Sequence, residues 1–206
     1  TLSTSSAASD VYKRQGIKGL NVTIPYKEKI IPYLDTLDNQ ARIIGAVNTI
    51  KVLEDGSLKG YNTDHYGFSK ALSSYPAITN KTALILGNGG ASKAIKYALN
   101  TLGYCCTTVS RNKTQDTISY KQVTKQVLEK HTLIVNTTPL GVAPDVLKCP
   151  EIPYRHLTKE HFLFDLIYNP QKTAFLKHGL AKGATIANGS KMLEYQAQEA
   201  WSIWNS

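Results

Sequence analysis

The 206-residue sequence contains few cysteines and no long apolar run. Its three cysteines, two of them adjacent at Cys105 and Cys106, lack the spacing of a metal site or a disulfide framework. We therefore expect a reducing cytoplasm as the compartment. The longest apolar runs, at 83–86 and 133–135, are far shorter than the roughly 18 residues that a membrane helix needs. They predict buried strands and no membrane partner.

Acidic residues are also scarce, since 15 Asp and Glu stand against 24 Lys and Arg, for a formal net charge of +9. A basic chain is compatible with nucleic acid, but the lysines are scattered. The sequence has no arginine-rich stripe, zinc-finger spacing or aromatic RNA-binding motif. A charged small-molecule ligand is therefore the better prediction. The 42% hydrophobic and 19% charged content is ordinary for a globular protein of one large or two small domains.

The first 15 residues, TLSTSSAASDVYKRQ, lack any apolar period. Small polar residues dominate, so this segment has no face to bury, and it lacks the apolar core of a secretory signal. We interpret residues 1–15 as a non-native or disordered leader. Native sequence is expected to begin near Gly16.

Residues 16–76 mix short strand and helix patterns. The β-branched run 22–24 predicts a strand that ends at Pro25, followed by a helical turn that carries Lys27. Helical spacing follows over 30–34 and 36–44. Residues 46–61 predict a hairpin around Asp55-Gly56, a strong tight-turn signal. A further helix is predicted over 67–72, before a boundary at Tyr75-Pro76.

A different pattern begins after this boundary. Short apolar runs alternate with helix-length segments, at 83–86, 106–109, 133–136, 162–165 and 184–187. Doubly buried strands that alternate with helices predict a parallel sheet with right-handed crossovers. The fold class is thus α/β, with a doubly wound Rossmann-type parallel sheet in the C-terminal part. Residues 190–204 carry the apolar stripe of an amphipathic helix.

A glycine-rich loop, GNGGAS, directly follows the strand predicted at 83–86. Gly87 permits a tight turn, Gly89 lets a pyrophosphate approach the backbone, and the helix N-terminus supplies positive potential. The third position of the usual fingerprint is Ser92, which is still small. A glycine triplet alone is often a plain strand-to-helix turn. Its place between a strand and a helix favours a dinucleotide site.

The cofactor type is indicated at the end of the next predicted strand. An enzyme that uses NAD normally has an acidic residue here to hold the ribose 2′-hydroxyl, whereas this chain has Arg111. A guanidinium can bind a 2′-phosphate. A solvated loop arginine is the alternative, but the glycine loop upstream favours NADP.

Eight motifs occur in the order found in shikimate dehydrogenase: NVTIPYK, GAVNT, GYNTDHYGF, GNGGAS, SRN, VNTTPLG, DLIYNPQKTAFL and ANGSKMLEYQA. From Gly16 to the C-terminus the chain resembles this family, whose members reduce 3-dehydroshikimate in aromatic amino-acid (chorismate) biosynthesis. The resemblance implies a partial α/β substrate-binding domain over 16–76 and an NADP-binding Rossmann-type domain over 77–188. It also implies a C-terminal helix over 189–206 that packs back on the substrate domain.

The resemblance implies that Lys27 is the catalytic lysine and Asp64 its carboxylate partner. Hydride transfer from a secondary alcohol also removes the hydroxyl proton, and the reverse reduction must donate one to the nascent alkoxide. A lysine with a pKa of about 10.4 is already a protonated donor at neutral pH, and an adjacent carboxylate stabilises it. The sequence leaves open whether Lys27 transfers the proton or mainly holds the substrate hydroxyl.

The resemblance also implies the remaining site residues. Substrate-binding residues are Thr23, Asn48, Tyr168 and Gln196. Cofactor-binding residues are Gly87, Asn88, Gly89, Gly90, Ala91, Ser110, Arg111, Asn136, Thr137 and Thr138. Taken singly, Asn48 could satisfy hairpin backbone, Tyr168 could be core and Gln196 a solvated helix position. The five histidines lack ligand spacing, so no metal is expected.

One departure from the family pattern concerns the N-terminus. Family members begin with a strand and helix whose Ser-x-Ser motif binds the substrate carboxylate, and residues 1–15 do not reproduce it. The chain therefore resembles a fragment that lacks part of its substrate domain. A quinate/shikimate dehydrogenase is one alternative. Another is a nucleotide-binding domain with little or no turnover.

Overall fold

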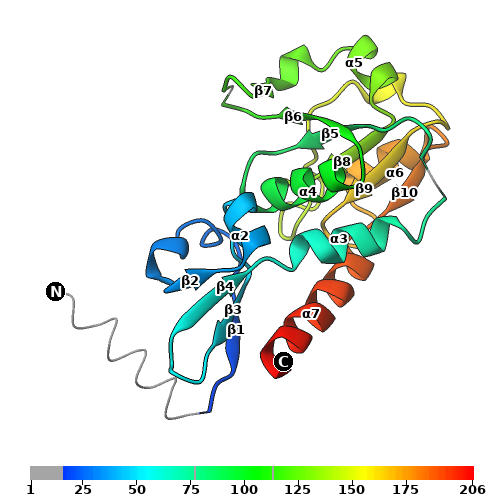
Figure 1. Cartoon of the computed structure of the whole chain (residues 1–206). Helices are drawn as coiled ribbons and strands as arrows, with labels where there is room; N and C mark the ends of the chain where they lie inside the picture. The colour runs from blue at the N-terminus through cyan, green and yellow to red at the C-terminus, as the bar shows by residue number, and fades with distance from the viewer. Residues whose placement is uncertain (1–15, 77, 113) are drawn as a thin grey trace.

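A computed structural model describes residues 16–76, 78–112 and 114–206 (Figure 1). The leader predicted over 1–15 lies outside the described residues. Two sheets organise the chain, one of four strands in the order β1-β3-β4-β2 and one of six in the order β10-β9-β8-β5-β6-β7. Figure 1 shows the small sheet in blue and cyan, well apart from the larger sheet, with helix α7 running back beside it.

The small sheet is built around the predicted hairpin. Its strands are β1 (Gly19–Asn21), β2 (Thr36–Leu37), β3 (Thr49–Val52) and β4 (Leu58–Tyr61). Strands β3 and β4 pair antiparallel across the Asp55-Gly56 turn, where Gly56 has a φ of +80°. A left-handed residue of this kind favours glycine, so the sequence signal for the hairpin is confirmed.

The strand predicted at 22–24 is wrong, because β1 ends at Asn21. The amide of Val22 still donates to the carbonyl of Asn48 (2.8 Å), but the carbonyl of Thr23 accepts from the amide of Tyr26 (2.9 Å). This bond closes a turn around Pro25, which has no amide hydrogen to continue a ladder. Lys27 consequently lies in a series of turns and not in a helix.

The two helices predicted next are shorter than expected. Residues 30–34 contain one 3₁₀ turn, η1 (Ile31–Tyr33), after which Leu34 is extended. Within 36–44, the first two residues form β2, and helix α2 (Asn39–Ile44) begins only after Asp38. The Asp38 carboxylate accepts from the amide of Gln40 (3.0 Å), so an N-cap sets the helix start.

All strands of the larger sheet are parallel. They are β5 (Thr82–Leu86), β6 (Cys105–Val109), β7 (Thr117–Ile118), β8 (Leu133–Asn136), β9 (Phe162–Asp165) and β10 (Thr185–Ala187). Five were predicted, and the short edge strand β7 was not. The predicted α/β class with a Rossmann-type parallel sheet is thus confirmed.

Helices connect and cover these strands. They are α3 (Asp64–Leu72), α4 (Gly90–Thr101), α5 (Lys125–Lys130), α6 (Ala174–Leu180) and α7 (Ser190–Asn205), with 3₁₀ turns η2 (Tyr120–Gln122) and η3 (Tyr154–His156). Helix α3 starts three residues before the predicted 67–72, because the Asn62 side chain accepts from the amide of Asp64 (3.1 Å). Of the helices described, none combines the length and the apolar character that crossing a bilayer would need.

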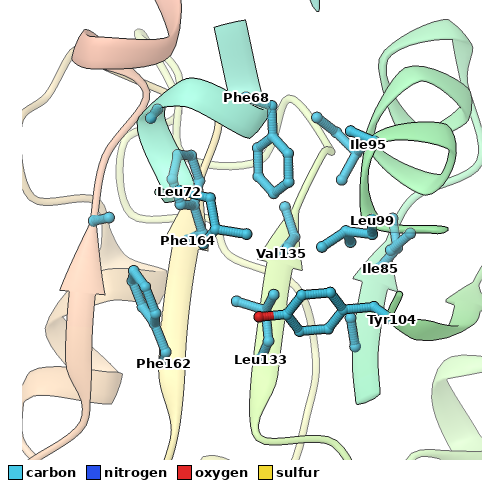
Figure 2. Close-up of a cluster of buried hydrophobic side chains, with 14 of the residues drawn as sticks. Phe68, Leu72, Ile85, Ile95, Leu99, Tyr104, Leu133, Val135, Phe162 and Phe164 are labelled. Atoms are coloured by element: carbon cyan, nitrogen blue, oxygen red, sulfur yellow. The ribbon is translucent and has the colours of Figure 1, made fainter. Parts of the chain in front are cut away.

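The core lies on both faces of the larger sheet. Figure 2 shows Phe68 of α3 and Ile95 and Leu99 of α4 directed at side chains of the strands, among them Val135 and Phe164. The opposite face is covered by Leu128 of α5 and by Phe175 and Leu176 of α6. Burial of each large apolar side chain contributes about 1.5–3 kcal/mol. These two clusters fix the ends of the strands, where the site lies.

Strand order creates a crevice at one place in the larger sheet. The chain runs outward from β5 to β6 and β7, and then returns to the other side of β5 for β8, β9 and β10. Ligands of open parallel sheets bind beyond the carboxyl ends of the strands, at such a switch point. Here the loops that follow β5 and β8 meet there, the first of which is the glycine loop.

Candidate active site

A cavity of about 600 Å³ lies at this switch point. Its walls are the turn that carries Lys27, the start of α3, the loops after β8 and β9, and helix α7. The polar residues predicted for substrate line it together, although they come from distant parts of the sequence. They are Thr23, Lys27, Asn48, Asp64, Tyr168 and Gln196.

Lys27 and Asp64 form an ion pair in this cavity. The Lys27 Nζ atom lies 2.6 Å from Asp64 Oδ2, and the two side chains are only 14% and 7% exposed. The backbone carbonyl of Lys27 accepts a hydrogen bond from the amide of Val47 (2.7 Å), which helps to position Lys27. Asp64 is the first residue of α3, where the helix dipole favours a negative charge. The pair presents an ammonium group to the cavity.

Asn48 connects the ion pair to α7. Its Nδ2 atom lies 3.0 Å from Asp64 Oδ1, 3.0 Å from Thr63 Oγ1 and 3.2 Å from Gln196 Oε1. Its Oδ1 atom accepts from the amide of Thr63 (2.7 Å). An amide nitrogen has two hydrogens and cannot serve three acceptors at once. The Thr63 hydroxyl also donates to Gln196 Oε1 (3.2 Å), so a bound hydroxyl group would exchange with one of these bonds.

His65, the second residue of α3, adds little positive charge beside Asp64. His65 follows Asp64, and burial lowers the pKa of its imidazole, against the opposing effects of Asp38 and Asp64. A histidine with a lowered pKa is neutral at neutral pH. Lys27 is thus the cation that faces Asp64. The described residues contain no cluster of His, Cys, Asp and Glu that could hold a metal ion.

The glycine loop has the shape that a pyrophosphate needs. Gly87 has a φ of +114°, and a Cβ there would lie 2.6 Å from Thr137 Oγ1, so the turn requires glycine. At Gly89, by contrast, a Cβ would meet no described atom within 4 Å. Gly89 is also the N-cap of α4, and it contributes no side chain to bond the first amides. A helix start without a side-chain cap leaves its first amides available to a phosphate.

The other residues predicted for the cofactor fall into three groups. Ala91, Thr137 and Thr138 line the cavity, while Ser110 and an exposed Arg111 follow β6. Asn136 is fully buried beneath the cavity, where its Oδ1 atom accepts from the Thr138 amide (3.0 Å) and hydroxyl (2.7 Å). Its side chain orients the loop and does not face the cavity.

Sequence reasoning missed several residues of the site. Asn21 lines the cavity and its side chain donates to the carbonyl of Asn48 (3.3 Å), while Thr63 bonds both Asn48 and Gln196. Both lie within motifs that were noted for a neighbouring residue, so adjacency in those motifs was the available signal. The apolar wall formed by Val142 and Met192 was missed as well, although Met192 lies in the motif that contains Gln196.

Comparisons with known proteins agree with this architecture. The family model for the shikimate dehydrogenase substrate binding domain matches residues 2–50. The NADP(+)-dependent shikimate dehydrogenase of Clostridium botulinum is 41% identical over 202 residues, which cover 93% of this chain and 77% of that protein. The chain belongs to the shikimate dehydrogenase family.

Solved structures of shikimate dehydrogenases have the same fold. The crystal structure of the Aquifex aeolicus enzyme has a TM-score of 0.85 at 37% identity, and the match covers 97% of this chain and 76% of the other. A Thermus thermophilus shikimate 5-dehydrogenase, in complex with NADP(H) and shikimate, has a TM-score of 0.83 at 31% identity, with 97% and 77% covered. In this fold the cavity and the glycine loop lie next to each other at the same end of the parallel sheet.

Proposed function

We propose that this chain catalyses the reversible NADPH-dependent reduction of 3-dehydroshikimate to shikimate, a step of aromatic amino-acid (chorismate) biosynthesis. One observation carries the proposal. The Lys27–Asp64 ion pair lies in a cavity that is also lined by Ala91, beside the glycine loop, and by Thr137. A proton donor and a dinucleotide loop are thereby brought to one site in a member of a dehydrogenase family.

The ion pair supplies the proton side of this reaction. NADPH, when bound, supplies the hydride that reduces the substrate carbonyl carbon. The Lys27 ammonium donates a hydrogen bond to the carbonyl oxygen and then a proton as the alkoxide forms. Asp64 holds this ammonium at 2.6 Å, and it preserves the charge that stabilises the developing oxyanion.

Several polar side chains are suited to orient a small polyhydroxy acid. The side-chain amides of Asn48 and Gln196 lie 3.2 Å apart at the cavity wall, and each has both a donor and an acceptor that a ring hydroxyl can bond. Thr23 and Tyr168 add hydroxyl groups on other walls of the cavity. A ligand with little apolar surface needs several such directional partners. We assign these four residues to substrate binding.

The cofactor is held by backbone amides and one cation in this proposal. Asn88, Gly89, Gly90 and Ala91, at the N-terminus of α4, would hold the pyrophosphate, with Gly87 forming the turn. Ser110 and Arg111 follow β6 and bind the 2′-phosphate, because a guanidinium matches phosphate geometry. Thr137 and Thr138, which line the cavity, would contact the nicotinamide end.

The domain boundaries and the compartment stay predictions. We assign residues 16–76 to the substrate domain, 77–188 to the NADP domain and 189–206 to the C-terminal helix. In support, Trp204 of α7 donates to the carbonyl of Ile50 in β3 (2.9 Å). The cytoplasm is expected from the three free cysteines, and a small molecule is the only partner that we propose.

The direct test adds NADPH and 3-dehydroshikimate to the purified 206-residue chain and records the absorbance of the reduced nicotinamide. We expect steady oxidation that requires both compounds. Faster oxidation with 3-dehydroquinate would favour a quinate dehydrogenase. NADPH binding without oxidation of either ketone would reduce the proposal to a nucleotide-binding domain.

A further inference from the structure

A fully buried carboxylate, Asp165, lies below the cavity and takes no part in the proposed chemistry. It is the last residue of β9, and in the sheet register it is paired with Asn136, the last residue of β8. Asp165 and Asn136 therefore both stand at the point where a strand ends and a loop that lines the cavity begins. Neither side chain is exposed.

The Asp165 carboxylate accepts hydrogen bonds from three separate segments. Its Oδ1 atom accepts from Asn136 Nδ2 (3.0 Å) and from the amide of Ile167 (3.1 Å), and its Oδ2 atom accepts from the Thr173 hydroxyl (2.5 Å). Every partner donates, so the site is matched to an ionised carboxylate, which only accepts. Charge-assisted bonds of this kind are stronger than neutral ones.

On one side these bonds lead to the loop after β8. Asn136 Oδ1 accepts from the amide and the hydroxyl of Thr138, and the Thr138 hydroxyl in turn accepts from the amide of Leu140 (3.3 Å). The same loop contacts Thr173 directly, since a Cβ at Gly141 would lie 3.4 Å from the Thr173 Cβ atom. Thr138 is thus bonded to one partner of Asp165, Asn136, and Gly141 lies beside another, Thr173.

On the other side the bonds lead to the loop after β9 and to α7. Ile167, whose amide donates to Asp165, accepts at its carbonyl from the amide of Gly189 (3.1 Å). Gly189 lies so close to Leu166 that a Cβ would be 2.0 Å from the Leu166 carbonyl oxygen. Helix α7 begins at the next residue and carries Gln196. The position of this helix therefore depends on the loop that Asp165 holds.

We propose that Asp165 is a positioning residue that ties the cofactor-side loop 137–143 to the substrate-side loop 166–169, with Thr173 as its essential partner. It fixes the distance between Thr138 on one wall of the cavity and Tyr168 on the other. Without the carboxylate, each loop loses a buried anchor while the apolar core beneath stays packed. The inference rests on the proposed function for its kinetic readout but not for its structural one.

The test compares variants of the full chain. Thr173→Val keeps the Cγ2 methyl group against Gly141 and removes the hydroxyl that donates to Asp165. Thr173→Ser keeps the hydroxyl and serves as the rescue. Asp165→Asn replaces one oxygen by a donor. The matched control is Thr107→Val, which removes a 2.9 Å hydrogen bond between β6 and His131 near the amino end of β8.

Hydrogen exchange of the Thr138 and Ile167 amides is the first readout, and it needs no activity. In Thr173→Val and Asp165→Asn we expect both amides to exchange about tenfold faster, the factor for loss of one buried hydrogen bond. Thr173→Ser and Thr107→Val should leave both rates near wild type. Faster exchange in α6 alone would show only the loss of its Thr173 cap, and would overturn the proposal.

Steady-state kinetics is the second readout. Misplaced loops should raise KM for both NADP and shikimate more than they lower kcat, whereas a merely destabilised fold would lower kcat through lost folded protein and leave KM unchanged. If Asp165→Asn does not fold, Thr173→Val decides alone. If the wild type shows no turnover, the proposed function fails, and the exchange rates still decide this inference.

Discussion

A Cβ atom placed on Gly67 would lie 2.8 Å from the Cβ atom of Gln196 and 2.6 Å from the carbonyl oxygen of Met192. Helices α3 and α7 thus approach so closely at Gly67 that no side chain fits between them. This contact brings Gln196 to within 3.2 Å of both Asn48 and Thr63. The absence of a side chain at one helical position therefore decides where a proposed substrate-binding group stands.

Replacement of Gly67 by alanine should push α7 away from α3. We expect KM for shikimate to rise about tenfold or more and stability to fall by about 1–3 kcal/mol, the usual cost of overpacking. Substrate titration and denaturant unfolding measure the two effects. Gly103→Ala serves as a control, since Gly103 adopts a φ of +80° outside this contact and a Cβ there would meet no described atom within 4 Å. A normal KM in Gly67→Ala would separate Gln196 from substrate binding.

Lys27→Ala should lower kcat by about 10²–10⁴-fold, the range for loss of a general acid or base. NADPH affinity should change little, because the Lys27 ammonium bonds Asp64, and the Lys27 atom that lies against Gly90 is the Cβ atom, which alanine keeps. Initial rates and a fluorescence titration with NADPH measure the two quantities. Lys29→Ala, which removes an exposed lysine two residues later, controls for lost charge. Near-normal turnover in Lys27→Ala would remove this residue from the chemistry.

Arg111→Asp should shift the cofactor preference from NADP toward NAD by about 1 to 3 kcal/mol, the value of a lost charge-assisted contact. The ratio of kcat/KM for the two cofactors is the measurement. Arg155→Asp, which makes the same charge change at an exposed position in η3, should leave that ratio unchanged. If both variants behave alike, long-range charge and not a phosphate contact sets the preference.

Burial raises the pKa of Asp165 from 3.8 to about 6, against the opposing effects of its bonds to Thr173, Ile167 and Asn136. The folded state then binds this proton more tightly than the unfolded state does. Protonated Asp165 therefore stabilises the fold. This stabilisation is fully present below pH 3.8 and is lost as the pH rises through about 6. This difference in pKa between the folded and unfolded states corresponds to at most about 3 kcal/mol of stability.

Asp165→Asn removes this titration. The unfolding free energy of the variant minus that of the wild type should therefore rise by up to about 3 kcal/mol between about pH 4 and about pH 7. Tyr154 faces Asp165, but burial raises its pKa, so it stays protonated in this range. Denaturant unfolding of both proteins across the pH range is the measurement. A difference that is constant with pH would mean that the pKa of Asp165 is the same in the folded and unfolded states.

Local chemistry explains the parts of the fold that were predicted correctly. The strands at 83–86 and 133–136 were found because a strand buried on both faces must be a short, continuous apolar run. The β3–β4 hairpin was found because only a few residues adopt a tight turn. Predictions failed between residues 22 and 38, where the boundaries depend on a hydrogen bond across the Pro25 turn and on the Asp38 cap.

The class of the fold, the glycine loop and the motifs that the family shares can be read along the chain, because each is a property of neighbouring residues. The folded arrangement was needed to show that Asn21 and Thr63 lie at the site, that Asn136 is turned inward to Asp165, and that Gly67 admits α7. These are contacts between residues far apart along the chain. Their geometry follows from how the two sheets and α7 pack together, and no local pattern of residues encodes it.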